Sequence, residues 1–383
     1  LEMMPDTSVF LDVDNLKEGA GGSQVDKSSA MLVFITERYL ESRACARELF
    51  KAVLRRKPII TILEPKAKRG GITREQITNL ITYGTYAQTV PVDSRQSTHG
   101  PSPDDLEVAR VDWSAKWQLG GEVTNWGHDR PPSGAEILDA LFEHPLIEWN
   151  RIGDLQDVTM RLIAERLLPA TEYIRTFVRG EIGQTQVKLL PPFEERCFHL
   201  YCSPHNLGAE QLAEELHRLI LSMMATNKST SFNKTTLLVT TELDQLSSCD
   251  YMLLYLTSAT WTSGASSAQY ATEVLTALKA GVALLPVHEY PSALEADGVR
   301  KACEFDEFWR DDWTPKHLLQ GEFNIYRKIA IPLKPGAWRQ PGLMQITLKL
   351  AEGGSPRQPA RGRPQLQRTM SMRDAHHKKS LRL

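Results

Sequence analysis

Residues 29–65 place two unbroken apolar runs on either side of a helical pattern, and this arrangement constrains the fold more than any other stretch. The runs cover residues 31–35 and 58–63, and neither alternates between apolar and polar residues, which is typical of strands buried on both faces. Between them, apolar residues from Ala44 to Val53 recur at helical spacing. A strand, a helix and a strand in this order predict a right-handed crossover between parallel strands, the building block of an open α/β sheet.

The same alternation of apolar runs and helical patterns continues along the chain. In the first half we expect a helix capped by Thr73, and further on helices over residues 135–142 and 157–168 with a short strand over 146–149. In the second half we expect strands over residues 197–202, 237–240, 251–256, 282–287 and 329–333, and helices over 209–221, 266–280 and 343–351.

Two segments match each other well enough to predict an internal repeat. Residues 29–36 match residues 249–257, and each segment is followed by a helix that carries a glutamate, Glu48 or Glu273. Near the end of each half, the sequence that begins at Leu155 parallels the one that begins at Leu343. We therefore expect a duplicated α/β domain.

Composition narrows the classes of partner and location. A net charge of -2 gives no global attraction to nucleic acid, and five cysteines without C-x-x-C spacing favour a reducing compartment and argue against a zinc site. No apolar run approaches the ~20 residues of a membrane helix, so we expect a cytoplasmic protein without a membrane span. Because the chain begins at Leu1 rather than at a methionine, the cytosolic part of a longer protein remains an alternative.

Two stretches depart from the α/β pattern. Residues 84–134 are irregular but hold three tryptophans, so we expect an ordered insertion rather than a disordered linker. Residues 353–383 hold eight Lys or Arg and one Asp and lack the apolar residues of a core, which predicts a basic disordered tail. The tail is either a solvated linker or an electrostatic contact for acidic lipid or protein.

Two runs of residues resemble TIR domains, the module of Toll/interleukin-1 receptors and plant resistance proteins. The run Val9-Phe-Leu-Asp-Val-Asp-Asn-Leu-Lys-Glu-Gly19 is similar to the second strand and following loop of that family. The run Ser42-x-x-Cys45-x-x-Glu48-Leu49 is similar to the start of its third helix. A weaker similarity links residues 305–309 to the late Phe-Trp box of the family.

The resemblance implies two flavodoxin-like three-layer α/β units with parallel sheets, the first of which lacks its N-terminal strand and helix. We place the first TIR-like domain at residues 1–170 and a linker at 171–192. The second, divergent domain follows at 193–352, before the basic tail at 353–383.

For function, the resemblance implies an intracellular signalling or scaffold protein whose partners are copies of itself or other TIR-like domains. The alternative is an NAD glycohydrolase, with NAD as substrate, no metal and no further cofactor. In some TIR domains the glutamate that corresponds to Glu48 is catalytic, since one carboxylate near the ribose can stabilise the oxocarbenium charge that develops during cleavage. The NAD-binding wall would then be the loop that holds Asp14, Leu16, Lys17 and Gly19.

Simpler explanations exist for both the glutamate and the second unit. Glu48 can be a first-turn acid that the helix dipole stabilises by ~0.3–1 kcal/mol. Glu273 is its counterpart in the second unit, which in a third interpretation is a structural spacer.

Overall fold

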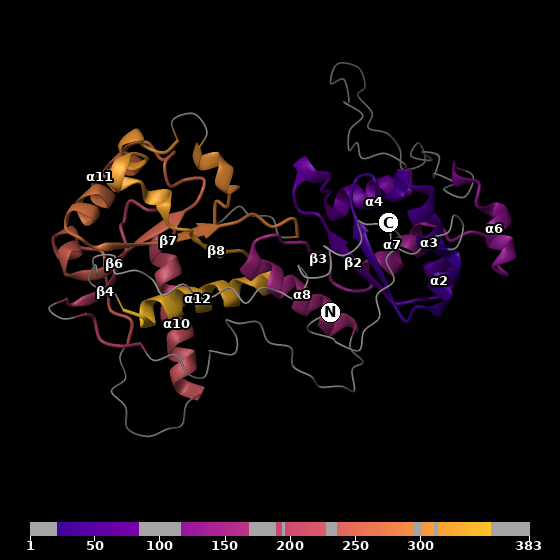
Figure 1. Cartoon of the computed structure of the whole chain (residues 1–383), viewed down its shortest axis with the longest axis horizontal. Helices are drawn as coiled ribbons and strands as arrows, with labels where there is room; N and C mark the ends of the chain where they lie inside the picture. The colour runs from indigo at the N-terminus through magenta and orange to yellow at the C-terminus, as the bar shows by residue number, and fades with distance from the viewer. Residues whose placement is uncertain are drawn as a thin grey trace, which may run out of the picture.

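The computed structural model of the chain describes residues 21–83, 116–167, 189–193, 196–226, 236–294, 300–309 and 313–353. These residues form an α/β structure with two parallel sheets, a three-stranded sheet of order β1-β2-β3 and a five-stranded sheet of order β5-β4-β6-β7-β8. The two sheets lie side by side along the long axis of the molecule (Figure 1). We call residues 21–167 the N-terminal half and residues 189–353 the C-terminal half.

The N-terminal half contains three strands and the helices that cover them. The strands are Met31–Ile35 (β1), Ile59–Leu63 (β2) and Ile147–Glu148 (β3). The helices are Gly21–Lys27 (α2), Arg43–Leu54 (α3), Arg74–Tyr83 (α4), Gly120–Asn125 (α6), Gly134–Phe142 (α7) and Gly153–Leu167 (α8).

The predicted crossover in residues 29–65 is confirmed. β1 and β2 are parallel and in register from Met31 opposite Ile59 to Ile35 opposite Leu63, with α3 between them in the chain. α3 begins where Ser42 accepts a hydrogen bond from the backbone N–H of Cys45 at 3.4 Å, an N-cap that satisfies one free donor of the first turn.

Helices cover the two faces of the N-terminal sheet unequally. Side chains from α2, α3, α4 and α7 share one apolar core with β1 and β2. Trp117 from the predicted insertion belongs to this core, where its ring meets Phe50 edge-on with centroids 6.1 Å apart. The opposite face is covered by α8, which packs against Ile60, Ile62 and Ile147.

The C-terminal half is built around a larger sheet. Its strands are Phe198–Tyr201 (β4), Val239–Thr240 (β5), Cys249–Leu256 (β6), Ala283–Glu289 (β7) and Ile331–Leu333 (β8). Its helices are Ala209–Thr226 (α10), Ala265–Lys279 (α11) and Arg339–Ala351 (α12). Short 3₁₀ turns connect the elements of both halves: Tyr39–Glu41, Ala67–Arg69, Leu243–Ser248, Phe305–Trp309, Lys316–Leu318, Gly321–Phe323, Ile325–Arg327 and Gly336–Trp338.

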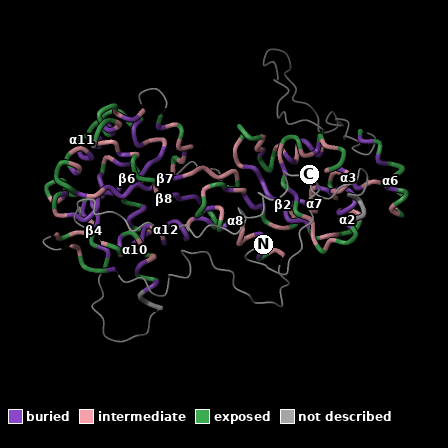
Figure 2. Tube along the Cα trace, in the orientation of Figure 1, coloured by how far each residue is buried: buried purple, intermediate pink, exposed green. Residues whose placement is uncertain are grey.

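The five-stranded sheet lies between two layers of helices. One apolar core joins it to α10 and α12, and a second joins it to α11. β6 lies between β4 and β7 and all eight of its residues are buried, which Figure 2 shows in purple. The expected helices and strands are therefore present in both halves, with ends that differ from the sequence patterns by a few residues.

Several predicted segments lie wholly or partly outside the described residues. The run from Val9 to Gly19 is one of them, as are most of the linker at 171–192 and the tail beyond Gly353. Of the insertion at 84–134, the described part begins at residue 116 and packs against α3, where Arg43 donates to the carbonyl of Trp117 at 2.9 Å.

Candidate functional site

Glu48 lies on the second turn of α3, with a half-buried side chain. The first turn of α3 contains no acidic residue, so the explanation of Glu48 as a first-turn acid is wrong. Its carboxylate lies near the phenol of Tyr39, whose pKa is raised well above the usual value by burial first, and then by the charges of Cys45 and Glu48. Glu48 is thus part of a local group that includes Tyr39 and Cys45.

The four residues expected to form the NAD-binding wall lie outside the described residues. These four residues are Asp14, Leu16, Lys17 and Gly19.

Glu273, the predicted counterpart of Glu48, lies in a polar group with more described members. Its side chain is 3% exposed, on the face of α11 that packs on the sheet. The hydroxyl of Tyr201 donates a hydrogen bond to Glu273 Oε2 at 3.0 Å, and His205 Nε2 lies 3.7 Å from Oε1. Burial and then the neighbouring Glu273 raise the pKa of Tyr201, so the phenol stays protonated and remains a donor.

Asn206 completes this group at the carboxyl end of β4. It is 2% exposed, and its side-chain amide makes no hydrogen bond of good geometry with the described part of the chain. It lies beside the hydroxyl of Tyr270, which donates to the carbonyl of Leu253 at 3.0 Å. β4 and β6 are the neighbours between which the sheet order changes direction, and ligands of open α/β sheets bind outside such a point.

Nothing in the sequence pattern singled out His205 and Asn206, which follow the strand predicted over residues 197–202. The signal that could have found them is the strand order. If the first strand of the half lies beside the third, the loop after the first strand meets the helix after the third, which carries Glu273.

A second polar group joins the two halves at the carboxyl ends of their strands. Glu148, at the end of β3, is fully buried and pairs with the ammonium of Lys334, just after β8. Its Oε1 also accepts hydrogen bonds from the Ser292 hydroxyl at 2.6 Å, from the Leu294 N–H at 3.0 Å and from the Ala293 N–H. The loop after β7 thus holds a carboxylate from the other half.

Further contacts surround this junction. Trp338 Nε1 donates to the carbonyl of Leu155 at 3.1 Å, and the two side chains form a small apolar cluster with Val158. At the surface, Lys66 pairs with Glu304 and Lys68 with Asp306, each at 2.8 Å. The junction therefore combines a buried ion pair, an apolar cluster and an exposed rim, as protein–protein interfaces do.

The two halves also repeat one ion pair between a buried glutamate and an arginine. Glu64 follows β2 directly and pairs with Arg151, which precedes α8. Glu289 ends β7 and pairs with Arg339, the first residue of α12, at 2.6 Å. The predicted match of Leu155 with Leu343 aligns Arg151 with Arg339, so the sequence already contained the signal for this pair.

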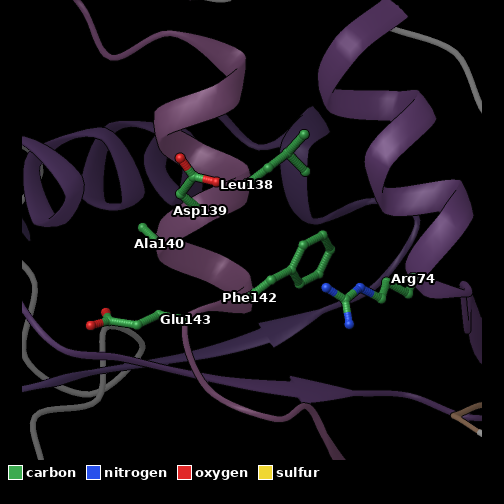
Figure 3. Close-up of a pocket in the computed structure, with 6 residues that line it drawn as sticks. All are labelled: Arg74, Leu138, Asp139, Ala140, Phe142 and Glu143. Carbon is green, nitrogen blue, oxygen red and sulfur yellow. The ribbon is translucent and has the colours of Figure 1, made fainter.

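A hollow of about 500 Å³ lies between the start of α4 and the end of α7 (Figure 3). Its lining includes Arg74, whose guanidinium lies 4.4 Å from the ring centroid of Phe142, and the acidic residues Asp139 and Glu143. No predicted site residue lines this hollow, so we assign it no role in either expected function.

Two features of the described residues bear on the predicted partners. No helix among them has the length and apolar content needed to cross a bilayer. No group of three or more His, Cys, Asp or Glu side chains among the same residues is arranged to hold a metal ion.

Comparisons with models of protein families, with curated proteins and with solved structures found no match to this chain. The site is therefore interpreted from its own geometry and from the resemblance in the residues quoted above.

Proposed function

We propose that this chain is an intracellular signalling or scaffold protein that works through association of TIR-like α/β domains. The observation that carries the proposal is the junction. Within one chain, two α/β halves already bind each other through the ends of their strands, with Glu148 and Lys334 buried between them. The junction has the composition of a protein–protein interface, which supports association between such units.

The strand order supports the expected kinship. The order β5-β4-β6-β7-β8 corresponds to 2-1-3-4-5 when the strands are numbered along the C-terminal half, which is the flavodoxin-like order. The N-terminal order β1-β2-β3 corresponds to the last three strands of this series. A divergent duplication accounts for this correspondence, because the first strand of the first copy is expected to be missing and the second, in the run from Val9 to Gly19, lies outside the described residues.

The experiment is to measure the molar mass of the purified full chain over a wide range of concentration by sedimentation velocity. Binding to separately purified TIR domains is measured in parallel. We expect a mass that rises with concentration, or a stable complex with a TIR domain. A chain that stays monomeric at every concentration and binds no TIR domain would contradict the proposal.

A second candidate function is NAD cleavage, favoured by the polar group around Glu273. A buried carboxylate held by Tyr201, beside His205 and Asn206, lies where a ligand of an open α/β sheet would bind. A ribose in this position would place its developing positive charge next to a fixed carboxylate. The predicted repeat matches Glu48 with Glu273, so both carboxylates are candidates.

This candidate is tested by incubating the full chain with NAD and measuring nicotinamide release. Glu48→Ala and Glu273→Ala are compared with Glu75→Ala, a control that removes an exposed carboxylate of α4. Loss of turnover in either of the first two variants, but not in the control, supports an enzyme. The absence of turnover in the wild-type chain rejects NAD cleavage and leaves the association proposal intact.

A further inference from the structure

β1 is the outer strand of its sheet among the described residues. One of its faces, which we call the uncovered face, is only partly covered, where the ring of Phe34 meets Trp149 edge-on with centroids 6.0 Å apart. β2 pairs with one edge of β1, and no described strand pairs with the other. Leu32 is 50% exposed and Phe34 is 38% exposed, whereas Val33 and Ile35 on the other face are fully buried. An apolar strand with a free edge is a template for pairing with another strand.

The corresponding strand of the C-terminal half lacks this feature. Counted back from Thr36 and Thr257, Leu32 matches Leu253, which is 0% exposed. There α10 and α12 both cover the face, while in the N-terminal half α8 covers only the part over β2 and β3. The uncovered face is thus a difference between two similar sheets and not a general property of the fold.

The backbone of β1 shows which of its groups face the free edge. The N–H of Met31 donates to the carbonyl of Pro58 at 2.9 Å, on the side of β2. In a parallel ladder, alternate residues direct both their N–H and their C=O to the same neighbour. The N–H and C=O groups of Leu32 and Phe34 therefore point to the free edge, and their side chains lie on the uncovered face.

Two copies of this edge complement each other. If β1 pairs antiparallel with β1 of a second copy about Val33, Leu32 of each copy lies opposite Phe34 of the other. Both residues have outward backbone groups, so each of the two pairs exchanges two N–H···O bonds. The apolar side chains of each pair then meet on the same face, which is the self-complementary contact that a two-fold dimer needs.

Charge at the two ends of the strand favours the same partner. Exposed Lys27 lies near the amino end of β1, beside Asp26, whose carboxylate is already paired with Lys51 and Arg55. Exposed Glu37 and Glu41 lie near the carboxyl end together with one arginine, Arg38. Antiparallel pairing brings the basic end of each copy to the acidic end of the other. β1 itself contains no charged residue, and therefore no charge that would oppose edge pairing.

We infer that the free edge and uncovered face of β1 form a self-association surface, on which a second copy of this chain binds by antiparallel pairing of the two β1 strands. The result is a continuous six-stranded sheet. The inference rests on the proposed association function and names the surface that carries it.

The first test replaces Phe34 by lysine in the full chain and measures self-association by sedimentation velocity. Phe34→Lys should weaken association at least tenfold, and Leu32→Lys should do the same. Ile329→Lys is the control, because Ile329 is 96% exposed in the other half. If the wild-type chain associates and Phe34→Lys associates equally well, the surface is wrong while the proposed function stands. A wild-type chain that does not self-associate overturns the inference, and the proposed function then depends on the binding of a separate TIR domain.

A charge exchange tests the antiparallel arrangement without touching the apolar residues. Lys27→Glu and Glu37→Lys each place like charges together, so each should weaken association. The double variant restores opposite charges at both ends and should recover most of the loss. Additive weakening in the double variant overturns the antiparallel arrangement.

Amide hydrogen exchange identifies the occupant of the edge. Under the inference, the amides of Leu32 and Phe34, which face the free edge, become protected as the concentration of the wild-type chain rises, whereas those of Val33 and Ile35 are protected at every concentration. Protection of Leu32 and Phe34 that is the same at every concentration means that a segment of the same chain occupies the edge, and overturns the inference. So does an absence of protection at concentrations where the chain is associated.

Discussion

The two halves of the molecule share an arrangement of three parallel strands but differ in how far the first of these strands is buried. β1, β2 and β3 follow each other as β6, β7 and β8 do, with parallel pairing throughout. Yet all eight residues of β6 are buried, while β1 exposes two of its five. Similar apolar runs thus end in different surroundings, because the burial of a strand depends on the neighbours that pair with it and cover it.

The comparison also shows what both halves keep. In each, a glutamate at the end of the second matched strand pairs with an arginine near the start of the last helix: Glu64 with Arg151, and Glu289 with Arg339. The pair joins a strand end to a helix start, so it fixes how the last helix leaves the sheet. What differs between the halves is therefore the outer strand and its cover, not this internal link.

The largest expected effect is at the junction, where the halves depend on each other. Lys334→Met leaves Glu148 buried without its cation, and loss of one partner of a buried pair destabilises by roughly 3–5 kcal/mol. Urea denaturation of the full chain measures the loss. The double variant Glu148→Gln with Lys334→Met should recover part of the stability, and a single variant as stable as wild type would mean that the halves do not depend on this pair.

The next-largest effect concerns two matched leucines, Leu253 in β6 and Leu32 in β1, of which the first is buried and the second half-exposed. Leu253→Ala creates a cavity in a packed core and should cost about 2–5 kcal/mol of unfolding free energy. Leu32→Ala, at the matching position, removes a half-exposed side chain and should cost less than ~1 kcal/mol. The unfolding free energies are measured by denaturation of dilute protein. Equal losses of unfolding free energy in the two variants would mean that Leu32 is packed as well as Leu253.

A smaller effect concerns pH. His288 of β7 is buried among the rings of Tyr290, Phe305 and Phe308 beside Cys303 Sγ, and burial lowers its pKa to about 3. The charge of Lys66 acts in the same direction, and a backbone contact with Cys303 acts against it. Between its unfolded pKa near 6.5 and a pH of about 3, only the unfolded chain binds this proton, so stability falls as pH falls.

The slope is about 1.4 kcal/mol per pH unit for one such group. The strand register places Leu63 at the matching position of the N-terminal half. His288→Leu should therefore flatten the loss of stability between pH 7 and pH 5, as measured by urea denaturation at both values. A variant with the same pH dependence as wild type would show that another group is responsible.

The smallest effect is at the exposed rim of the junction. Lys68 and Asp306 are both largely exposed, and such pairs contribute about 0–1 kcal/mol. Lys68→Ala should leave the urea midpoint almost unchanged at moderate salt. A loss as large as that of Lys334→Met would mean that the rim, rather than the buried pair, holds the halves together.

Most of the fold follows from local patterns in the sequence. Unbroken apolar runs such as residues 59–63 mark the buried strands, and Thr73 with Gln76 marks the start of α4, where each side chain accepts from the backbone N–H of the other. The repeat match of Glu48 with Glu273 pointed to the polar group in the C-terminal half. These features depend on residues close together in the chain or on one internal alignment.

What could not be predicted depends on contacts between distant residues. The sequence pattern places Glu148 in a short strand but does not predict its contacts, because its partners Lys334 and Ser292 lie more than a hundred residues away. Likewise, residues 31–35 appear buried on both faces in sequence, since nothing local tells whether a strand has one neighbour or two. The roles of Glu48 and of the loop from Asp14 to Gly19 remain predictions that the NAD experiment tests.

The hydrogen bonds of Glu148 bear on how this protein can be divided for experiment. Its carboxylate accepts hydrogen bonds from backbone N–H groups after β7. The N-terminal half thus provides the acceptor and the C-terminal half the donors of these bonds. Cleavage of the chain anywhere between residues 168 and 188 would leave Glu148 in one fragment without Lys334. In the other fragment, the N–H groups of Ala293 and Leu294 would lose their acceptor. Isolated fragments would therefore be poor substitutes for the intact polypeptide, and a weak result from either would say little about the native molecule.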